Sequence, residues 1–266
     1  MPDAPHTSDA SVRPTTVPTV FLHMPRTGGT TLNTIFKRVY AAGPLFQAGL
    51  NGSTHIDACA RFVALPPEQR AAFAYVTGHL ERAVLTSIPG RPFIFTFLRD
   101  PVTRLPSLYA YVKRTPDHHM HPWLVHTNAS LEHFVARCPW DEVQNGMTRR
   151  LAGVFQARTN ERIDLLRAVA TIKRYVAFVG LQEDFDTSLR CLGRLLGLPE
   201  SDLHYVRQNV NPDPAALEAP DTNAIDAIRF YNALDCALYD FCRELFTEEV
   251  CRVTDVEASE AATKKR

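Results

Sequence analysis

Residues 20–32 combine the residue types that a phosphate-binding loop requires. They read Val-Phe-Leu-His-Met-Pro-Arg-Thr-Gly-Gly-Thr-Thr-Leu, an apolar strand followed by a loop and the start of a helix. Glycines in such a loop let the backbone approach an anion closely, and the N-terminus of the next helix presents free N–H groups and a positive dipole end. Hydroxyl groups and a guanidinium add further donors. The predicted anion-binding residues of this loop are Arg26, Thr27, Gly28, Gly29, Thr30 and Thr31.

The loop differs from the phosphate-binding loop of ATPases, because no Gly-Lys-Ser/Thr occurs in the chain. A Gly-Gly pair before a helix can also be a simple turn. The helix itself is predicted by an apolar stripe with i, i+3, i+4, i+7 spacing. The residues of this stripe are Leu32, Ile35, Phe36, Val39 and Tyr40.

Residues 93–114 predict a second strand followed by a helix. The first six residues are mostly apolar and aromatic, which is typical of a buried parallel strand. Asp100 is the expected N-cap and Pro101 the first helical residue. Arg99 lies at the carboxyl end of the strand, where open α/β sheets bind ligands, and Ser107 follows eight residues later. We predict that Arg99 and Ser107 bind one anion; a structural Arg–Asp pair is the alternative.

The elements that must position these residues follow an alternating order. Strand signals near 17–23, 74–77, 93–98 and 175–179 are separated by helical patterns. This alternation predicts an α/β fold, a three-layer sandwich whose central parallel sheet lies between helices, with the P-loop-like phosphate-binding loop after the first strand. Pro106 falls inside the helix expected after Asp100, so that helix either starts late or kinks.

Both segments resemble the nucleotide-binding motifs of sulfotransferases that use 3′-phosphoadenosine 5′-phosphosulfate (PAPS). The first is similar to the family's 5′-phosphosulfate loop, His-x-Pro-Lys-Thr-Gly-Gly-Thr-Ser/Thr. The second resembles its 3′-phosphate-binding segment, Arg-Asp-Pro-x-x-Arg-x-x-Ser-x-Tyr-x-Tyr. The chain most resembles the heparan sulfate 2-O-sulfotransferase-like group and its bacterial relatives. Further matches to that group lie at residues 77–79, 144–149 and 178–185.

The resemblance implies transfer of a sulfuryl group from PAPS to a hydroxyl of a saccharide or similar small molecule, with 3′-phosphoadenosine 5′-phosphate (PAP) as the second product. His79 matches the family's Gly-His position and would be the general base. Arg26 stands where the family has Lys and would stabilise the leaving phosphate, although an arginine is not expected to donate a proton. The resemblance implies further nucleotide contacts from Arg99, Ser107, Arg149 and Arg207.

Two alternatives stay open. A nucleotide kinase-like phosphotransferase is one, although the missing Gly-Lys-Ser/Thr argues against it. A non-catalytic protein that binds 3′-phosphoadenosine nucleotides is the other, because Arg26 replaces the family's Lys. Residues 118–121, His-His-Met-His, are expected in a variable loop near the acceptor, where Trp123 could stack on a sugar. Their Pro-flanked spacing fits no regular metal-ligand pattern, so no metal is predicted.

Composition limits the remaining function classes. The 266 residues carry a formal net charge of zero, so no global field recruits nucleic acid or an acidic membrane. No apolar run approaches the roughly 20 residues that span a bilayer, and the N-terminus lacks the apolar core of a signal peptide. We therefore expect a soluble, cytoplasmic enzyme of undetermined oligomeric state. The expected organisation is a disordered lead at 1–17, a sulfotransferase domain at 18–250 and a disordered tail at 251–266.

Overall fold

The computed structural model describes residues 17–49, 54–154, 161–206 and 220–263. Five strands form one sheet in the order β2-β3-β1-β4-β5, and every neighbouring pair is parallel. Their bounds are β1 Thr19–Leu22, β2 Leu45–Ala48, β3 Tyr75–Gly78, β4 Phe93–Leu98 and β5 Phe178–Leu181. The predicted α/β class with a central parallel sheet is confirmed.

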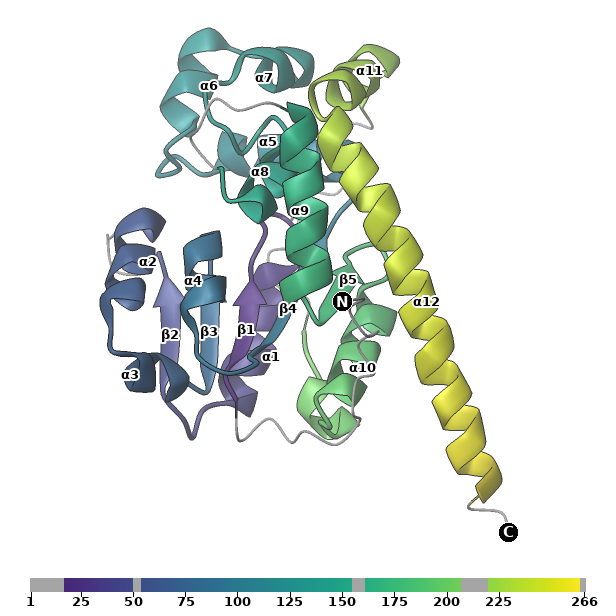
Figure 1. The fold of residues 1–266 in the computed structure, drawn as a ribbon. Helices are drawn as coiled ribbons and strands as arrows, with labels where there is room; N and C mark the ends of the chain where they lie inside the picture. The colour runs from purple at the N-terminus through teal and green to yellow at the C-terminus, as the bar shows by residue number, and fades with distance from the viewer. Residues whose placement is uncertain (1–16, 50–53, 155–160, 207–219, 264–266) are drawn as a thin grey trace.

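Helices flank the sheet on both faces and continue beyond its carboxyl edge (Figure 1). Their bounds are α1 Gly29–Val39, α2 His55–Ala64, α3 Pro67–Ala71, α4 Arg82–Ser87, α5 Pro101–Arg114, α6 His121–Thr127, α7 Leu131–Arg137, α8 Gly146–Ala152, α9 Glu161–Tyr175, α10 Phe185–Leu195, the 3-10 helix η1 Glu200–Leu203, α11 Thr222–Tyr231 and α12 Ala233–Thr263. Asp100 caps α5 as predicted, since its carboxylate accepts a hydrogen bond from the Val102 N–H. Because α5 begins at Pro101 and runs through Pro106, it does not start late.

The strand order reverses between β1 and β4. The chain passes from β1 to β2 and β3 on one side of the sheet, and from β4 to β5 on the other. The connections that leave the carboxyl ends of β1 and β4 therefore diverge, and such a switch point is where open α/β sheets bind ligands. The two segments with predicted anion-binding residues begin at these two strand ends.

Strand β2 was not predicted from the sequence. It has only four residues at the edge of the sheet, and its first residue, Leu45, is exposed. A short edge strand needs apolar side chains on only one face, so its hydrophobic signal is weak. The other four strands lie within a few residues of their predicted positions.

The molecule has two apolar cores. The main core joins the sheet to its helices, and stacked rings such as Phe21 and Phe95, 4.9 Å apart between centroids, lie at its centre. A smaller core joins α5, α6, α7 and α11, which we call the helical lobe. This lobe lies beyond the carboxyl ends of the strands (Figure 1). The variable loop expected at residues 118–121 leads into α6, which begins at His121 and whose Leu124 is buried in this second core.

The C-terminal helix α12 is longer than the sequence indicated. It continues to Thr263, so the backbone of 251–263 is helical where a disordered tail was predicted. Alanine and glutamate are frequent in this segment, and both favour helix even when a polar sequence buries little surface. The predicted disordered lead lies outside the described residues, except for Val17.

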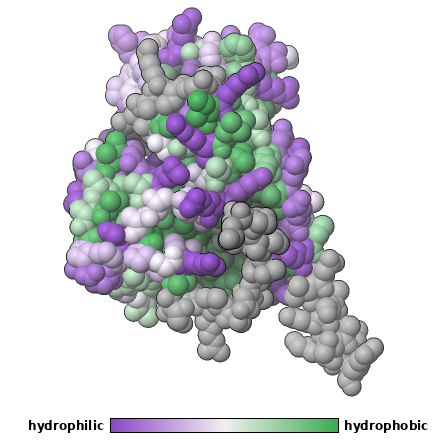
Figure 2. Space-filling model, viewed as in Figure 1, coloured by the Kyte–Doolittle hydropathy of each residue, from purple (hydrophilic) through white to green (hydrophobic). Residues whose placement is uncertain are grey.

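The surface has no dominant hydrophobic face in the view of Figure 2, where hydrophilic and hydrophobic residues intermingle. Among the described helices, none combines the length and apolar character needed to cross a membrane.

Candidate active site

The loop between β1 and α1 has a backbone that few residues adopt. Arg26 has φ +67° and Gly28, the N-cap of α1, has φ +83°. A Cβ on Gly28 would lie 2.8 Å from the ring of Phe185, so glycine is required by packing as well as by φ. The Thr27 hydroxyl braces the turn by donating to the Met24 carbonyl at 2.8 Å. The loop is therefore held in one shape at the helix N-terminus.

The first turn of α1 has the electrostatics of an anion site. It contains no acidic side chain that would neutralise the positive end of the helix dipole. Thr30 is exposed in this turn and Thr31 is buried. Gly29, the first helical residue, has no room for a side chain, because a Cβ there would collide with the imidazole of His23.

Three predicted nucleotide-binding residues meet beside this loop. The Arg26 Nε donates to the Ser107 Oγ at 3.1 Å, and the Arg99 Nη1 donates to the Arg26 carbonyl at 3.3 Å. The guanidinium carbon of Arg26 also lies 4.7 Å from the centre of the Tyr111 ring. The structure thus brings together residues from the first loop, the end of β4 and helix α5.

This part of the molecule concentrates positive charge in a chain of zero net charge. The guanidinium of Arg114 lies 5.6 Å from the same Tyr111 ring that Arg26 contacts. Burial lowers the pKa of Arg26 to about 10, and the charges of Arg114 and Arg99 add to the shift, while Tyr111 opposes it. Arg26 still carries its charge at neutral pH. The cluster can therefore attract an anion locally although the molecule as a whole cannot.

His79 follows β3 at a bend that only glycine permits. Gly78 has φ +125°, and a Cβ there would lie 2.6 Å from the carbonyl oxygen of Ala48 on β2. The His79 ring lies edge-on to that of His23, with 5.0 Å between centroids. Because His23 also contacts Gly29, the candidate base lies next to the first turn of α1.

The two imidazoles are neutral at pH 7. Burial, together with smaller contributions from the charges of Arg150 and Arg26, lowers the pKa of His23 to about 4. Burial also lowers the pKa of His79 well below its ordinary value, with contributions from His23 and Arg150. A neutral imidazole has a free nitrogen lone pair, so either histidine can accept a proton from a hydroxyl.

Adjacent arginines of α8 have different surroundings. Arg149, which was predicted to bind the nucleotide, forms a 2.8 Å ion pair with Asp141 and is half-buried. Arg150 is buried, lies 3.4 Å from the Glu142 carboxylate and, unlike Arg149, has a charge that acts on nearby imidazoles. Its charge lowers the pKa of His23, His55 and His79.

Sequence reasoning singled out Arg149 and missed Arg150. The only available signal was the Arg-Arg pair at 149–150, and the rotation of α8 decides which member approaches the histidines. Arg149 stays a predicted nucleotide contact, although the ion pair with Asp141 is the contact that the structure assigns to it. Arg207 lies outside the described residues.

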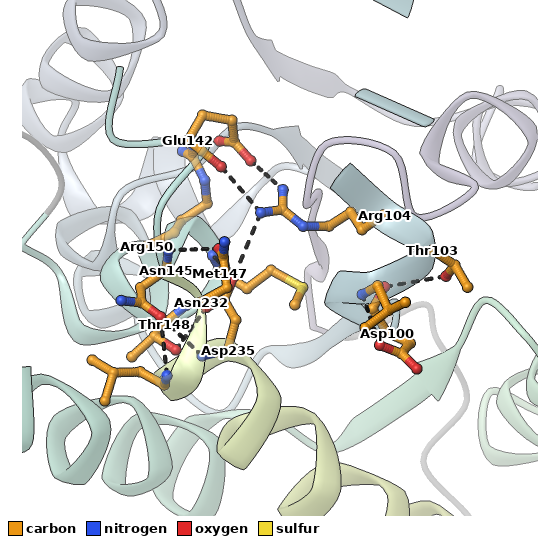
Figure 3. A network of polar contacts seen from close by, with 12 residues as sticks. Asp100, Thr103, Arg104, Glu142, Asn145, Met147, Thr148, Arg150, Asn232 and Asp235 are labelled. Carbon is orange, nitrogen blue, oxygen red and sulfur yellow. Dashed lines mark hydrogen bonds and ion pairs between the residues drawn. The ribbon is translucent and has the colours of Figure 1, made fainter. Parts of the chain in front are cut away.

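A buried polar network joins α5, α8 and α12 (Figure 3). The completely buried Arg104 lies 2.6 Å from the Glu142 carboxylate and 3.5 Å from that of Asp235. Asp235 also accepts hydrogen bonds from the backbone N–H and the hydroxyl of Thr148, both at 2.7 Å. Arg104 is therefore an internal counter-ion and not an anion-binding residue on the surface.

The motif at 144–149 belongs to the same network. Asn145 has φ +54°, and its side-chain oxygen accepts hydrogen bonds from the Leu234 and Asp235 N–H groups at 3.0 and 3.2 Å. These contacts hold the start of α8 against the start of α12. Arg104 attaches α5 to the same point. The network therefore fixes the position of α8, which carries Arg150, relative to α5, which carries Ser107.

Within the described ranges, no group of three or more His, Cys, Asp and Glu side chains is arranged to hold a metal ion. The residues that converge on the first turn of α1 are cationic, hydroxylic or imidazole groups, which suit anion binding and proton transfer.

Comparison with known proteins identifies relatives over almost the whole chain. Residues 2–264 match the family model described as galactose-3-O-sulfotransferase. The chain is 28% identical over 269 residues to galactose-3-O-sulfotransferase 3 of Bos taurus, covering 92% of this chain and 60% of that protein. The corresponding protein of Homo sapiens is 28% identical over 262 residues, with 90% and 58% covered. The chain thus spans about three fifths of the length of these curated relatives.

One solved structure, mouse sulfotransferase SULT7A1 complexed with PAP, matches with a TM-score of 0.40 and 14% identity, covering 96% of this chain and 91% of that one. At this level of similarity it adds nothing to the assignment, which depends on the family model. From the match over residues 2–264, the chain belongs to the galactose-3-O-sulfotransferase family.

Proposed function

We propose that this protein transfers a sulfuryl group from PAPS to a hydroxyl group of a saccharide. The observation that carries the proposal is the convergence of Arg26, Arg99 and Ser107 at the first turn of α1, beside His79. Family membership supports the same activity. The donor set also fits PAPS, since three guanidinium groups and an uncompensated helix N-terminus suit a ligand with several phosphate and sulfate charges.

PAPS supplies an activated sulfuryl group whose S–O bond to the 5′-phosphate breaks as the acceptor oxygen bonds to sulfur. Arg26 and the N–H groups of the first turn stabilise the charge that grows on the leaving phosphate, which lowers the barrier more than it strengthens ground-state binding. Arg99 and Ser107 bind the 3′-phosphate and so favour PAPS over nucleotides without one.

His79 takes the proton of the acceptor hydroxyl in this proposal. Its neutral state at pH 7 supports the role, and the contact between its ring and that of His23 supports a location beside the transferring group. His23 contacts the first turn of α1 and buttresses the loop. The charge of Arg150 adds to the effect of burial, which keeps both imidazoles neutral.

We propose a galactoside, modified at its 3-hydroxyl, as the first acceptor to test, because the matched relatives are named for that reaction. The narrower resemblance to the heparan sulfate 2-O-sulfotransferase-like group remains a prediction, which parallel assays with uronate-containing saccharides would test. The cytoplasmic location also remains a prediction.

Calorimetric titration with PAP, using ADP as the comparison ligand, tests the donor site. The wild type should prefer PAP, and Arg99→Ala should lose that preference because Arg99 binds the group that ADP lacks. The matched control is Arg91→Ala, an exposed arginine two residues before β4, which should leave the preference intact.

Other outcomes of this titration favour the alternatives. Equal or stronger binding of ADP, with magnesium-dependent turnover of ATP, would replace the proposal by a kinase-like activity. Binding of PAP without transfer to any of a broad panel of saccharides would instead leave a nucleotide-binding protein.

A further inference from the structure

Four aromatic side chains form a continuous series between the donor site and the helical lobe. The Tyr111 ring lies 5.6 Å from that of His118, which stacks on His119 at 4.4 Å. The His119 ring lies in turn 5.6 Å from that of Trp140, in an edge-to-face arrangement. We call Tyr111, His118, His119 and Trp140 the aromatic wall. It joins the last turns of α5 to the segments before α6 and α8.

The wall connects the two halves of the proposed reaction. At one end, Tyr111 contacts the guanidinium of Arg26, the residue assigned to the leaving phosphate. Further along, a positive charge on His119 would lower the pKa of both His79 and His55, whose rings lie 6.3 Å apart. An acceptor whose hydroxyl lies between sulfur and His79 would therefore extend along these rings.

The wall is accessible to a ligand. His119 is exposed, and Tyr111, His118 and Trp140 are half-buried, so each presents part of its surface to solvent. Their chemistry matches a saccharide, because a pyranose ring combines an apolar C–H face with hydroxyl edges. Aromatic rings cover such a face, and the ring nitrogens of His and Trp bond to hydroxyl groups.

We propose that the aromatic wall is the acceptor subsite and that Trp140 and His119 stack against the saccharide ring. This inference rests on the proposed function, and it gives a specific role to two histidines of the tract that the sequence analysis expected only to lie near the acceptor. Trp123, the residue first considered for stacking, is half-buried and packs against the core of the helical lobe, as Trp140 does; its ring contacts are with His133, Phe134 and Trp140, whereas Trp140 also contacts His119. It supports Trp140 and is not itself part of the wall.

The chain has only two tryptophans, which allows a direct test. In a Trp123→Phe variant, Trp140 is the sole tryptophan and reports on its own surroundings. Titration of this variant with lactose in the presence of saturating PAP should give a saturable change in tryptophan emission. Adding His119→Ala to the same background should weaken the lactose affinity about tenfold.

Kinetics provide the second measurement. Trp140→Leu and His119→Ala should each raise the KM for the saccharide about tenfold or more, with PAP affinity unchanged. The matched control is His126→Ala, an exposed histidine near the end of α6, which should leave both quantities unchanged. If Trp140→Leu does not fold, Trp140→Phe and the exposed His119 still give the comparison.

The failure of the proposal differs from the failure of the proposed function. Lactose binding seen by calorimetry without a change in Trp140 emission would overturn the wall as the acceptor subsite. Absence of saccharide binding to the PAP-bound protein would overturn it as well. If the wild type does not prefer PAP to ADP, the sulfotransferase activity is rejected instead. The lactose titration would still report whether the wall binds sugar.

Discussion

At the scale of single residues, the neutral state of His23 and His79 sets what they can do. Burial and the charge of Arg150 keep both imidazoles unprotonated at pH 7, so the positive charge of the site resides in its arginines. A bound polyanion would stabilise the imidazolium and raise both pKa values, which would strengthen the base at the moment it is needed. Donor binding and base strength are thus coupled through one electrostatic field.

Replacing His79 should slow catalysis without changing the affinity for PAP. We expect His79→Gln to lower kcat by roughly 10²–10⁴, the usual contribution of a general base, while PAP affinity stays unchanged. Single-turnover assays with calorimetry of PAP binding measure the two effects. His23→Gln is the comparison, since it removes the neighbouring imidazole that contacts Gly29. A kcat of His79→Gln within threefold of wild type would reject His79 as the base.

The same histidines predict how stability depends on pH. Their folded pKa values lie below the unfolded value of about 6.5, so the unfolded chain takes up protons first as pH falls. The stability that His23 contributes is therefore present above pH 6.5 and is lost between about pH 6.5 and 4, by at most roughly 1.4 kcal/mol per pH unit, and the loss from His79 begins at the same upper limit. In urea denaturation from pH 7 to 4, the free energy of unfolding should decline less steeply for His23→Gln than for wild type. Parallel plots of this free energy against pH would contradict the prediction.

At the scale of elements, each site residue depends on how one strand or helix ends. The bend at Gly78 lets the chain leave β3 against β2, and Asp100 caps α5 at the switch point. The rotation of α8 presents Arg150 to the histidines and leaves Arg149 to pair with Asp141. Substitutions at such ends should disturb the site without touching a ligand.

A glycine pair tests the bend after β3. Gly78→Ala should lower the free energy of unfolding by more than the roughly 1–3 kcal/mol of backbone strain, because the new methyl also collides with the Ala48 backbone. Gly90→Ala is the matched control, since Gly90 also has positive φ but a Cβ there meets nothing within 4 Å. Chemical denaturation of both variants isolates the steric part. Equal losses would show that contact with β2 is unimportant.

At the scale of the whole molecule, the buried network unites segments far apart in sequence. Arg104, Glu142 and Asp235 join α5, the segment before α8 and α12 at one point (Figure 3). The helical lobe, which carries most of the aromatic wall, is thereby attached to α12. Because α12 packs against β5, the lobe is also attached to the sheet, whose strands lead into the β1–α1 loop and His79. This attachment fixes the position of the proposed acceptor subsite relative to the β1–α1 loop and His79.

Removing one charge from the network should be costly. Asp235→Asn leaves the buried Arg104 undercompensated and weakens the acceptor of the Thr148 hydrogen bonds, so we expect a loss of about 3–5 kcal/mol in unfolding free energy. The control is Asp240→Asn, whose exposed ion pair with Arg243 should contribute little. Thermal and urea denaturation of the two variants make the comparison, and similar small losses in both would show that the network is dispensable.

The sequence alone determined the parts that depend on neighbouring residues. An apolar run followed by glycines and a periodic stripe specifies a strand, a tight turn and a helix, so the loop between β1 and α1, the cap at Asp100 and the parallel sheet could be predicted. The two motifs also pointed to the PAPS-dependent sulfotransferases, whereas membership of the galactose-3-O-sulfotransferase family came only from the family model. Four residues at a sheet edge offered too little pattern to reveal β2.

The tertiary structure decided what depends on packing between distant segments. The bond from Arg26 to Ser107 spans 81 positions, and that from Thr148 to Asp235 spans 87. Local propensity carries no information on such pairs, nor on which side of α8 approaches the histidines. Which of Arg149 and Arg150 acts on the histidines, and which rings meet in the aromatic wall, followed only from how the helices pack, because helix rotation is set by the burial of one face against its neighbours.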